Sequence, residues 1–329
     1  MKAQVAIIGA GISGLICANE LLKYNVDVQL FEKGRHAGGR VATRFASRTD
    51  ASAYFDHGAQ YFTARSEIFQ NEVRSLVANN AAALWNGRIG KVREGVFEAE
   101  QHVHERYVGV PYMRSVPEYL ARKVNVHTER RVKCIDIDER KYKLQFEDGS
   151  TSPEFDAVVV AVPPAQAALL IENFADLQAL TSSIKMAACW ATFVSLRSRL
   201  QIPFDGLFVS NASLSWICRD SSKPFRPGGE RWVLHSTHEW ADEHVNLSAD
   251  EVSTILLGEL FRVTKQESIS AEYIKSHRWL YAIPQEEQSF EILQSGCLVI
   301  CGDWCSSGRV EGAFLSGRRA ASAVLNLLR

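Results

Sequence analysis

Residues 5–14 read Val5-Ala6-Ile7-Ile8-Gly9-Ala10-Gly11-Ile12-Ser13-Gly14, and this stretch decides the fold. Its apolar start is typical of a buried parallel strand. The spacing G-x-G-x-x-G follows, and residues 15–22 then place leucines on one face of a helix. Residues 26–31 alternate in polarity as a second strand, which ends at Glu32. Strand, glycine turn, helix, strand and acid in this order predict a dinucleotide-binding unit.

Each glycine of the turn has its own task. Gly9 permits the tight turn, Gly11 leaves room for a pyrophosphate against the backbone, and Gly14 lets the helix pack closely on the sheet. The helix N-terminus offers N–H groups to the phosphates. Glu32 follows Gly14 at close to the ~20 residues expected for an acid that binds ribose hydroxyls. Its charge would repel a 2′-phosphate, which disfavours a phosphorylated adenosine ribose.

Two other interpretations explain less of this stretch. A glycine-rich turn in another kind of α/β protein would not require the second strand and the acid. A secretory signal peptide would require a basic start and a small-residue cleavage pattern. Only Lys2 is basic, and Asn19 and Glu20 interrupt the apolar run.

Composition bounds the class of protein. The 329 residues predict about two domains, and the 46% apolar and 23% charged residues are ordinary for a globular chain. The net charge of −1, with scattered basic residues, gives no nucleic-acid footprint. No apolar run reaches the ~18 residues of a membrane span, so the default expectation is a cytoplasmic protein without nucleic acid or membrane as partner. The seven cysteines, without a C-x-x-C pair, indicate reduced core thiols.

Two loops follow the first unit. Residues 33–40 end in Gly38-Gly39-Arg40, and a guanidinium beside paired glycines can neutralise a diphosphate. On its own this loop would favour an exposed arginine; directly after the glycine turn it favours a cofactor. Residues 56–62 form a second loop with a glycine beside small and aromatic residues. His102 and His104 alternate on a predicted strand, but no third ligand lies nearby and no metal site is expected.

The middle of the chain predicts an aromatic-rich sheet. Residues 186–292 hold five of the seven tryptophans in strand-like patterns, interrupted by one helix over residues 249–264. Such strands suit either a plain core sheet or a wall over a flat ring system. Near the end, a buried strand leads into Gly302-Asp303, and a final helix begins around Glu311-Gly312-Ala313. An aspartate at the carboxyl end of a parallel strand lies where such sheets bind ligands.

Together these motifs resemble the FAD-binding flavoprotein amine oxidase superfamily, and within it the renalase group. The glycine-rich and acidic motifs near the two ends of the chain resemble the superfamily. The resemblance to the renalase group lies in residues 216–224, 232–240 and 277–281. It implies an α/β, two-domain flavoprotein with a Rossmann-like FAD-binding domain and a substrate domain of antiparallel sheet plus helix. The FAD-binding domain is expected to be discontinuous, over residues 1–60, 105–165 and 293–329, with the substrate domain over residues 61–104 and 166–292.

The resemblance also implies the cofactor contacts. Glu32 would hold the adenosine ribose, Arg40 would lie along the pyrophosphate or ribityl chain, and Val132 would meet the adenine through its backbone. Asp303 would bind the ribityl or pyrophosphate region. The full expected set is Gly9, Gly11, Ile12, Ser13, Gly14, Glu32, Lys33, Gly39, Arg40, Val132, Gly302, Asp303, Glu311, Gly312 and Ala313. The Ser-Gly-Gly-Cys signature of covalent attachment is absent, so FAD is expected to be noncovalent. Cys301-Gly302-Asp303 stands where amine oxidases often carry Ala-Gly-Glu.

The implied activity is an FAD-dependent oxidase. It would take a hydride from 2- or 6-dihydronicotinamide isomers of NAD(P)H to flavin N5 and pass the electrons to O₂, giving H₂O₂. Hydride loss from a dihydropyridine needs no general base, which agrees with the lack of an obvious Ser-His-Asp or paired-carboxylate set. Two alternatives stay open: oxidation of an amine or polyamine, and a flavin-binding sensor without turnover.

The expected substrate pocket contains five residues. Trp279 and Tyr281 would share one strand face and form a slot for a pyridine ring. Arg278 would point the other way, or toward the slot rim if the strand bulges. Only the resemblance places Trp216 and His235 nearby. Each of the five is equally consistent with core or surface packing.

Overall fold

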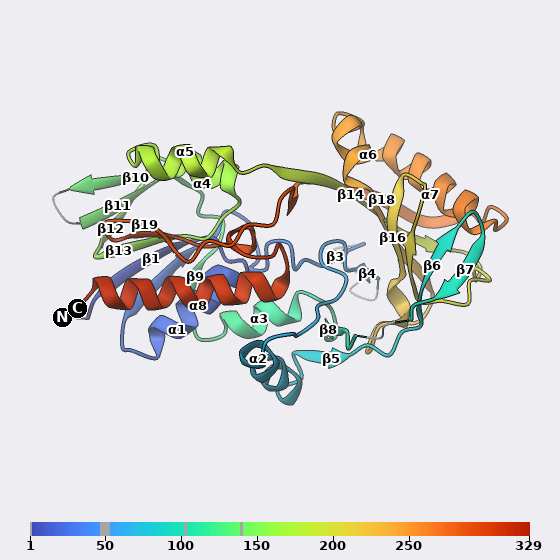
Figure 1. Ribbon diagram of the computed structural model, residues 1–329, viewed down its shortest axis with the longest axis horizontal. Helices are drawn as coiled ribbons and strands as arrows, with labels where there is room; N and C mark the ends of the chain where they lie inside the picture. The colour runs from blue at the N-terminus through green and yellow to red at the C-terminus, as the bar shows by residue number, and fades with distance from the viewer. Residues whose placement is uncertain (1, 47–52, 102–103, 139–140) are drawn as a thin grey trace.

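The computed structural model describes residues 2–46, 53–101, 104–138 and 141–329. His102, one of the two histidines considered above as metal ligands, lies outside these residues. The chain forms two lobes, and both ends lie on the first of them (Figure 1). The two-domain α/β fold expected from the sequence is confirmed.

The first lobe contains a six-stranded sheet that is parallel except for one edge strand. The order is β19 (Leu293–Ser295), β20 (Leu298–Ile300), β13 (Ala157–Val160), β1 (Gln4–Ile8), β2 (Asp27–Phe31) and β9 (Asn125–His127). Only β19 runs antiparallel to its neighbour. Side chains of β1 alternate between two cores, because Val5 and Ile7 enter one while Ala6 and Ile8 enter the other.

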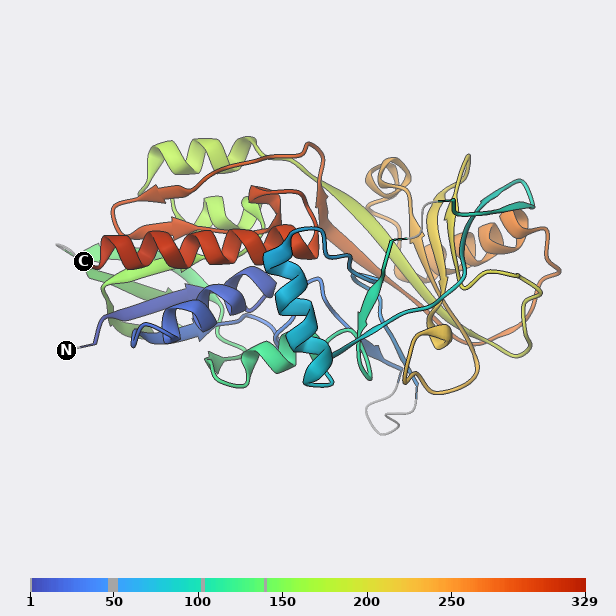
Figure 2. The ribbon, with the colours of Figure 1, turned by 60° about the horizontal axis from the view of Figure 1, so that its bottom comes forward.

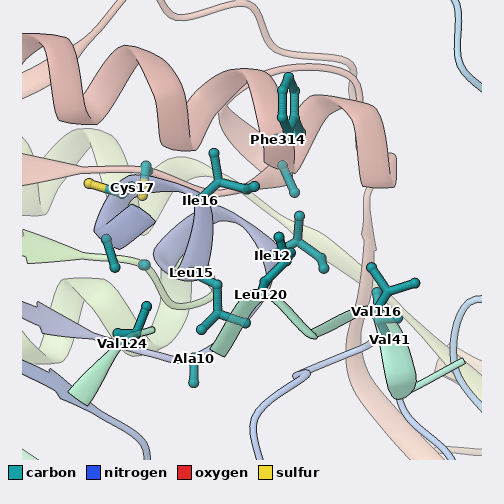
Figure 3. Close-up of a cluster of buried hydrophobic side chains, with 14 of the residues drawn as sticks. Ala10, Ile12, Leu15, Ile16, Cys17, Val41, Val116, Leu120, Val124 and Phe314 are labelled. Atoms are coloured by element: carbon teal, nitrogen blue, oxygen red, sulfur yellow. The ribbon is translucent and has the colours of Figure 1, made fainter. Parts of the chain in front are cut away.

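Each face of this sheet is covered. One core holds α1 (Ile12–Leu22), α2 (Glu67–Ala78), α3 (Ser115–Ala121) and α8 (Val310–Leu327) (Figures 2 and 3). The other holds α4 (Pro164–Leu170), α5 (Ala175–Ser183) and a three-stranded sheet of β10 (Val132–Asp138), β11 (Lys141–Phe146) and β12 (Thr151–Phe155). Gly317 of α8 crosses directly over Ser13, where an added Cβ would lie 2.3 Å from the Ser13 carbonyl oxygen. This close crossing brings the last helix to the glycine turn.

The second lobe contains a seven-stranded sheet. Its order is β18 (Ala271–Pro284), β14 (Met186–Leu196), β17 (Glu230–Ser236), β16 (Leu214–Arg219), β15 (Gly206–Val209), β6 (Ile89–Arg93) and β7 (Val96–Ala99). Packed against this sheet are α6 (His238–Glu243) and α7 (Ala249–Thr264). The remaining elements are short: β3 (Arg44–Phe45), β4 (Tyr54–Phe55), β5 (Ala82–Leu84), β8 (Tyr107–Gly109), and the 3₁₀ turns η1 (Asp220–Ser222) and η2 (Asp303–Cys305).

Local sequence signals explain where α7 begins and ends. A capping box opens α7, because the Ser248 hydroxyl accepts from the Glu251 N–H while the Glu251 carboxylate accepts from the Ser248 N–H. The helix ends at Lys265 in the left-handed conformation, at the boundary the sequence predicts.

The packing of three helices differs from the domain boundaries expected from the sequence. Residues 166–183 and 67–78 were expected in the substrate domain, yet α4, α5 and α2 pack against the first lobe. Their apolar faces complete its two cores. We therefore propose that the substrate domain begins near β14 on one side and near β6 on the other.

Candidate active site

The glycine turn of the first lobe leaves an open helix N-terminus. Gly14 is tightly enclosed, since an added Cβ would lie 2.1 Å from the Gly9 carbonyl oxygen. Gly11 is the N-cap of α1 and has no side-chain cap. An added Cβ at Gly11 would meet no atom within 4 Å. The uncapped N–H groups at the start of α1, including those of Ile12 and Ser13, together with the open space at Gly11, suit the binding of a pyrophosphate.

The carboxylate of Glu32 is fixed at the end of β2. It accepts hydrogen bonds from the Ala10 N–H at 2.9 Å and the Gly34 N–H at 2.7 Å. These two bonds hold the carboxylate beside the glycine turn, with acceptor capacity left over. The side chain of neighbouring Lys33 points elsewhere, because its Nζ donates to Gln166 at 2.8 Å. Val132, at the start of β10, is buried beside a register shift in the β10–β11 pairing.

Arg40 and Asp303, far apart in the sequence, form an ion pair in the folded chain. The guanidinium gives the carboxylate two hydrogen bonds, of 2.8 and 2.5 Å. Nη1 of Arg40 also donates to the Ala282 carbonyl at 3.0 Å, which ties the end of β18 to the first lobe. The backbone around Gly39 is folded over the glycine turn, since the Gly38 N–H donates to the Ala10 carbonyl at 2.8 Å.

The start of α8 approaches this site from the other side. Gly302, Gly312 and Ala313 are buried there. Glu311 is also buried, but its carboxylate accepts from the N–H groups of Arg65 and Ser66 and from the Ser66 hydroxyl. Its side chain therefore caps the N-terminus of α2, and only its backbone is free for the cofactor role that the sequence suggested.

Trp279 lies on the face of β18 that is turned toward the first lobe. Its Nε1 donates to the His57 carbonyl at 2.9 Å, and its ring stacks on the His57 ring at 5.2 Å and 29°. Its edge contact with the His277 ring is 4.5 Å between centroids. Tyr281 is half-buried two residues further along the same strand.

Arg278 lies on the opposite face, the first of the two orientations expected from the sequence, and therefore leaves the set of pocket residues. Its guanidinium donates to the Val245 carbonyl and lies 5.8 Å from the Trp190 ring. The alternation of side chains along β18 is the reason, since Trp279 takes the other face.

Trp216 is a core residue, which corrects a second pocket assignment. Its ring packs against Tyr61 at 5.6 Å and Phe208 at 4.8 Å. An added Cβ on Gly206 would fall 2.6 Å from that ring, so the ring fills the space over the neighbouring strand. His235 is paired with Trp216 across β16 and β17, and its Nε2 lies 3.4 Å from Nε2 of Gln60.

Three histidines at this place are held neutral. Burial lowers the pKa of His57 to about 3 and the pKa values of His235 and His277 to about 4. Nearby positive charge adds to each shift: Lys223 lowers the pKa of His235, and Arg44 lowers the pKa values of His57 and His277. Nδ1 of His57 is buried and finds no hydrogen-bond partner in the described part of the chain.

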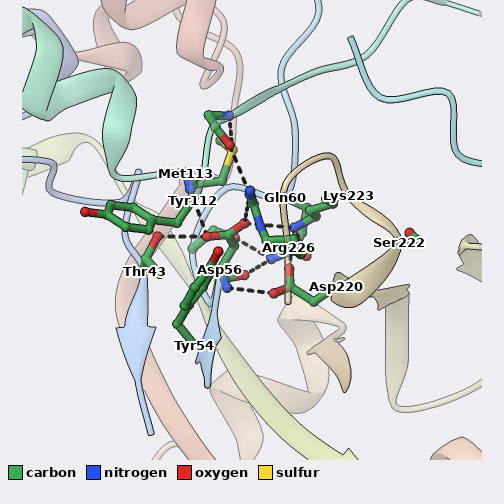
Figure 4. A network of polar contacts seen from close by, with 12 residues as sticks. Thr43, Tyr54, Asp56, Gln60, Tyr112, Met113, Asp220, Ser222, Lys223 and Arg226 are labelled. Atoms are coloured by element: carbon green, nitrogen blue, oxygen red, sulfur yellow. Dashed lines mark hydrogen bonds and ion pairs between the residues drawn. The ribbon is translucent and has the colours of Figure 1, made fainter. Parts of the chain in front are cut away.

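A buried ionic cluster that was not assigned from the sequence contains Asp56, the residue before His57 (Figure 4). Asp56 pairs with Arg226 at 2.6 Å and with Lys223 at 3.3 Å, and Lys223 also pairs with Asp220 at 2.6 Å. Burial acts to raise the pKa of Asp56, but the charges of Lys223 and Arg226 outweigh it and hold the pKa below its usual range. The sequence analysis noted the loop at residues 56–62 and the motif at residues 216–224. It could not predict that they pair, because no local spacing relates segments so far apart in the chain.

These observations fit a bound dinucleotide. An uncapped helix N-terminus and a fixed carboxylate lie at the carboxyl ends of β1 and β2, and the loop that carries Arg40 folds over the same turn. Within the described ranges, no group of three or more His, Cys, Asp or Glu side chains is placed to hold a metal ion. A groove of about 630 Å³ lies elsewhere, beside Arg197 and Arg219 at the far end of β14. In the part of the chain that the structure covers, no helix is both long and apolar enough to cross a bilayer.

Comparison with known proteins agrees with this geometry. Residues 74–325 match the family described as flavin containing amine oxidoreductase, and residues 7–79 match an NAD(P)-binding Rossmann-like domain. Renalase from Mus musculus is 23% identical over 303 residues, covering 85% of each chain. Cyclohexylamine oxidase from Brevibacterium oxydans IH-35A superposes with a TM-score of 0.78 at 14% identity, over 100% of both chains. A putrescine oxidase variant superposes with a TM-score of 0.74 at 13% identity, over 99% of this chain and 100% of the other. The chain therefore belongs to the flavin-containing amine oxidoreductase family.

Proposed function

We propose that this protein is a renalase-like oxidase that binds FAD noncovalently and oxidises dihydronicotinamide isomers reduced at the 2- or 6-position. The family match supports the general part of this proposal, an FAD-dependent oxidoreductase that acts on a small molecule. The proposal adds the substrate class and the residues that orient it.

The observation that carries this proposal is the uncharged wall beside the expected flavin face. Trp279, His57 and His277 form it, and burial keeps both imidazoles neutral by lowering their pKa values to about 3 and about 4. Asp56 is the adjacent carboxylate, and it is neutralised by Lys223 and Arg226. A neutral aromatic wall suits a dihydropyridine, whereas a cationic amine would gain nothing from a carboxylate that is already paired.

The residues of the wall orient the substrate and supply no general base. Bound FAD would supply the hydride acceptor, and its reoxidation would give O₂ two electrons and two protons, one of them from solvent, to form H₂O₂. Trp279 and Tyr281 would hold the pyridine ring against the reacting atom, and no proton has to leave the ring carbon with the hydride. Neutral histidines also add no positive charge against the pyridinium product.

Amine oxidation is the second candidate. The family description favours it, whereas the likeness to cyclohexylamine oxidase shows only a shared fold. An identity of 14% carries the fold alone, so the choice between the two substrates depends on the wall.

A hydrogen peroxide assay tests the proposal. The 2- and 6-dihydro isomers should give peroxide and oxidised dinucleotide, whereas putrescine and cyclohexylamine should give none. Trp279→Ala should slow turnover while FAD stays bound, and Arg278→Ala, on the opposite strand face, should not. Peroxide from the amines alone would establish the second candidate. No turnover with either class would favour the flavin-binding sensor over both.

A further inference from the structure

The strand that carries Trp279 is irregular directly after that residue. Between two pairs of facing residues, β14 advances only from Ala187 to Cys189, whereas β18 covers the whole span from Trp279 to Ile283. The strand β18 also forms one edge of the described sheet, where ladder hydrogen bonds are made on one side only. The sheet by itself therefore does not fix residues 280–282.

The guanidinium of Arg40 holds this segment in place. Its Nη1 donates to the Ala282 carbonyl at 3.0 Å and to Oδ2 of Asp303 at 2.8 Å, and its Nη2 donates to Oδ1 of Asp303 at 2.5 Å. These bonds use both hydrogens of Nη1 and one of Nη2. In the described part of the chain, the Nε hydrogen and the second Nη2 hydrogen are thus left for another acceptor. Arg40 can therefore hold Ala282 and Asp303 while it contacts a phosphate.

The backbone of Arg40 is held by the loop that carries His57. Its carbonyl accepts a hydrogen bond from the Ala59 N–H at 2.9 Å. Gly58 packs directly on the same carbonyl, because an added Cβ at Gly58 would collide with the oxygen. A shift of Arg40 would therefore displace this loop as well.

These contacts close into a ring that includes the wall. Arg40 donates to the Ala282 carbonyl on β18. From the same strand, Nε1 of Trp279 donates to the His57 carbonyl at 2.9 Å. From the loop of His57, the Ala59 N–H donates back to Arg40. Contacts within one hydrogen-bond network are energetically coupled, so a change at Arg40 should alter the placement of Trp279 and His57.

We propose that Arg40 is a positioning residue that couples cofactor binding beside Asp303 to the placement of Trp279 and His57. A ribityl hydroxyl held by Asp303, or a phosphate held by Arg40, would restrain the guanidinium, and the ring transmits this restraint to the wall. Coupling between two sites is reciprocal, so an ordered wall also strengthens cofactor binding. The inference rests on the FAD binding proposed above and is independent of the substrate.

Amide hydrogen exchange measured by mass spectrometry tests the coupling. In the parent protein, saturating FAD should slow exchange roughly fivefold in peptides from residues 56–62 and 277–284, besides slowing it at the glycine turn. Arg40→Lys keeps the positive charge but not the planar fork, so saturating FAD should slow exchange at the glycine turn alone. Arg278→Ala removes another arginine–carbonyl contact of β18, on the opposite face, and should keep the parental pattern.

A double-mutant cycle tests the reciprocal effect from the far side of the ring. Trp279→Phe keeps an aromatic ring but removes the N–H that is donated to His57. In the parent background it should raise the Kd for FAD roughly fivefold, and in the Arg40→Lys background it should leave the Kd unchanged. An equal effect in both backgrounds, or parental protection of residues 277–284 in Arg40→Lys, would overturn the proposal.

The same proteins separate this proposal from the proposed function. If FAD protects the wall only when Arg40 is present but the dihydronicotinamide isomers never reduce the flavin, the positioning role stands and the substrate assignment fails. If Arg40→Lys binds no FAD, the comparison of the parent with Trp279→Phe decides. Loss of FAD-dependent protection in residues 56–62 of Trp279→Phe supports the coupling, and full protection there contradicts it.

Discussion

At the scale of single residues, the sequence predicted chemistry best where a motif fixes its neighbours. Glu32 and the glycines were located because their spacing is set by one β-α-β unit. The cluster of His57, His235 and His277 could not be located in this way. These residues come from a loop and two strands, and only the folded sheet brings them together.

Glu32→Ala should weaken FAD binding. The variant removes the acceptor that fixes Ala10 and Gly34 and that we expect to bind the ribose. Charge-assisted hydrogen bonds of this kind contribute ~1.5–3 kcal/mol, so the Kd for FAD should rise at least tenfold. Fluorescence titration of the flavin-free protein measures the Kd, and flavin released by heat confirms noncovalent binding. Glu154→Ala, from an exposed ion pair, is the control. An unchanged Kd would remove Glu32 from the site.

At the scale of elements, periodicity located α1, α7, β1, β2 and the strand that leads into Gly302. It missed α5 and α6, which are short, and it did not show that α4 and α5 complete the core of the first lobe. That packing depends on contacts between distant segments, which a local pattern does not contain. The opposite faces of Trp279 and Arg278 did follow from strand alternation.

A pair of glycine variants separates folding from cofactor binding within one turn. Gly14→Ala should lower the Tm of the flavin-free protein, since its Cβ would lie 2.1 Å from a backbone oxygen. Gly11 has a φ of −75° and open space at its Cβ, so Gly11→Ala should keep the Tm. It should nevertheless bind FAD more weakly, because the methyl group enters the pyrophosphate space. If Gly11→Ala bound FAD as tightly as the parent, the pyrophosphate would have to lie elsewhere.

At the scale of the whole molecule, the long strands β14 and β18 extend from the second lobe toward the first (Figure 1). The Arg40 contact with the Ala282 carbonyl anchors the end of β18 beside Asp303. The three neutral histidines lie between the second-lobe sheet, which carries His235 and His277, and the loop that carries His57.

Stability should therefore depend on pH in a defined window. The pKa values of the three histidines fall from 6.5 to about 3 or 4 on folding. Between about pH 6.5 and pH 4 the unfolded chain binds more protons, so the free energy of unfolding should fall as the pH drops through that window and stay level above it. Each unit of pKa difference contributes ~1.4 kcal/mol.

The matched variants for this prediction are His277→Gln and His104→Gln, the second at an exposed position. Thermal unfolding at pH 7.5 and pH 5 should show a smaller loss of Tm in His277→Gln than in the parent, and the parental loss in His104→Gln. Equal losses in all three proteins would mean that His277 is not held neutral.

The central claim is that the uncharged wall of Trp279, His57 and His277 orients a dihydropyridine against the flavin. The most direct measurement is anaerobic single-turnover reduction of the holoprotein by the 6-dihydro isomer of NADH, with hydrogen or deuterium at ring carbon 6. One equivalent should bleach the flavin and yield one equivalent of NAD⁺, and deuterium should slow the bleaching. A flavin that stays oxidised with this isomer and its 2-dihydro counterpart, but is bleached by putrescine or cyclohexylamine, would contradict the account.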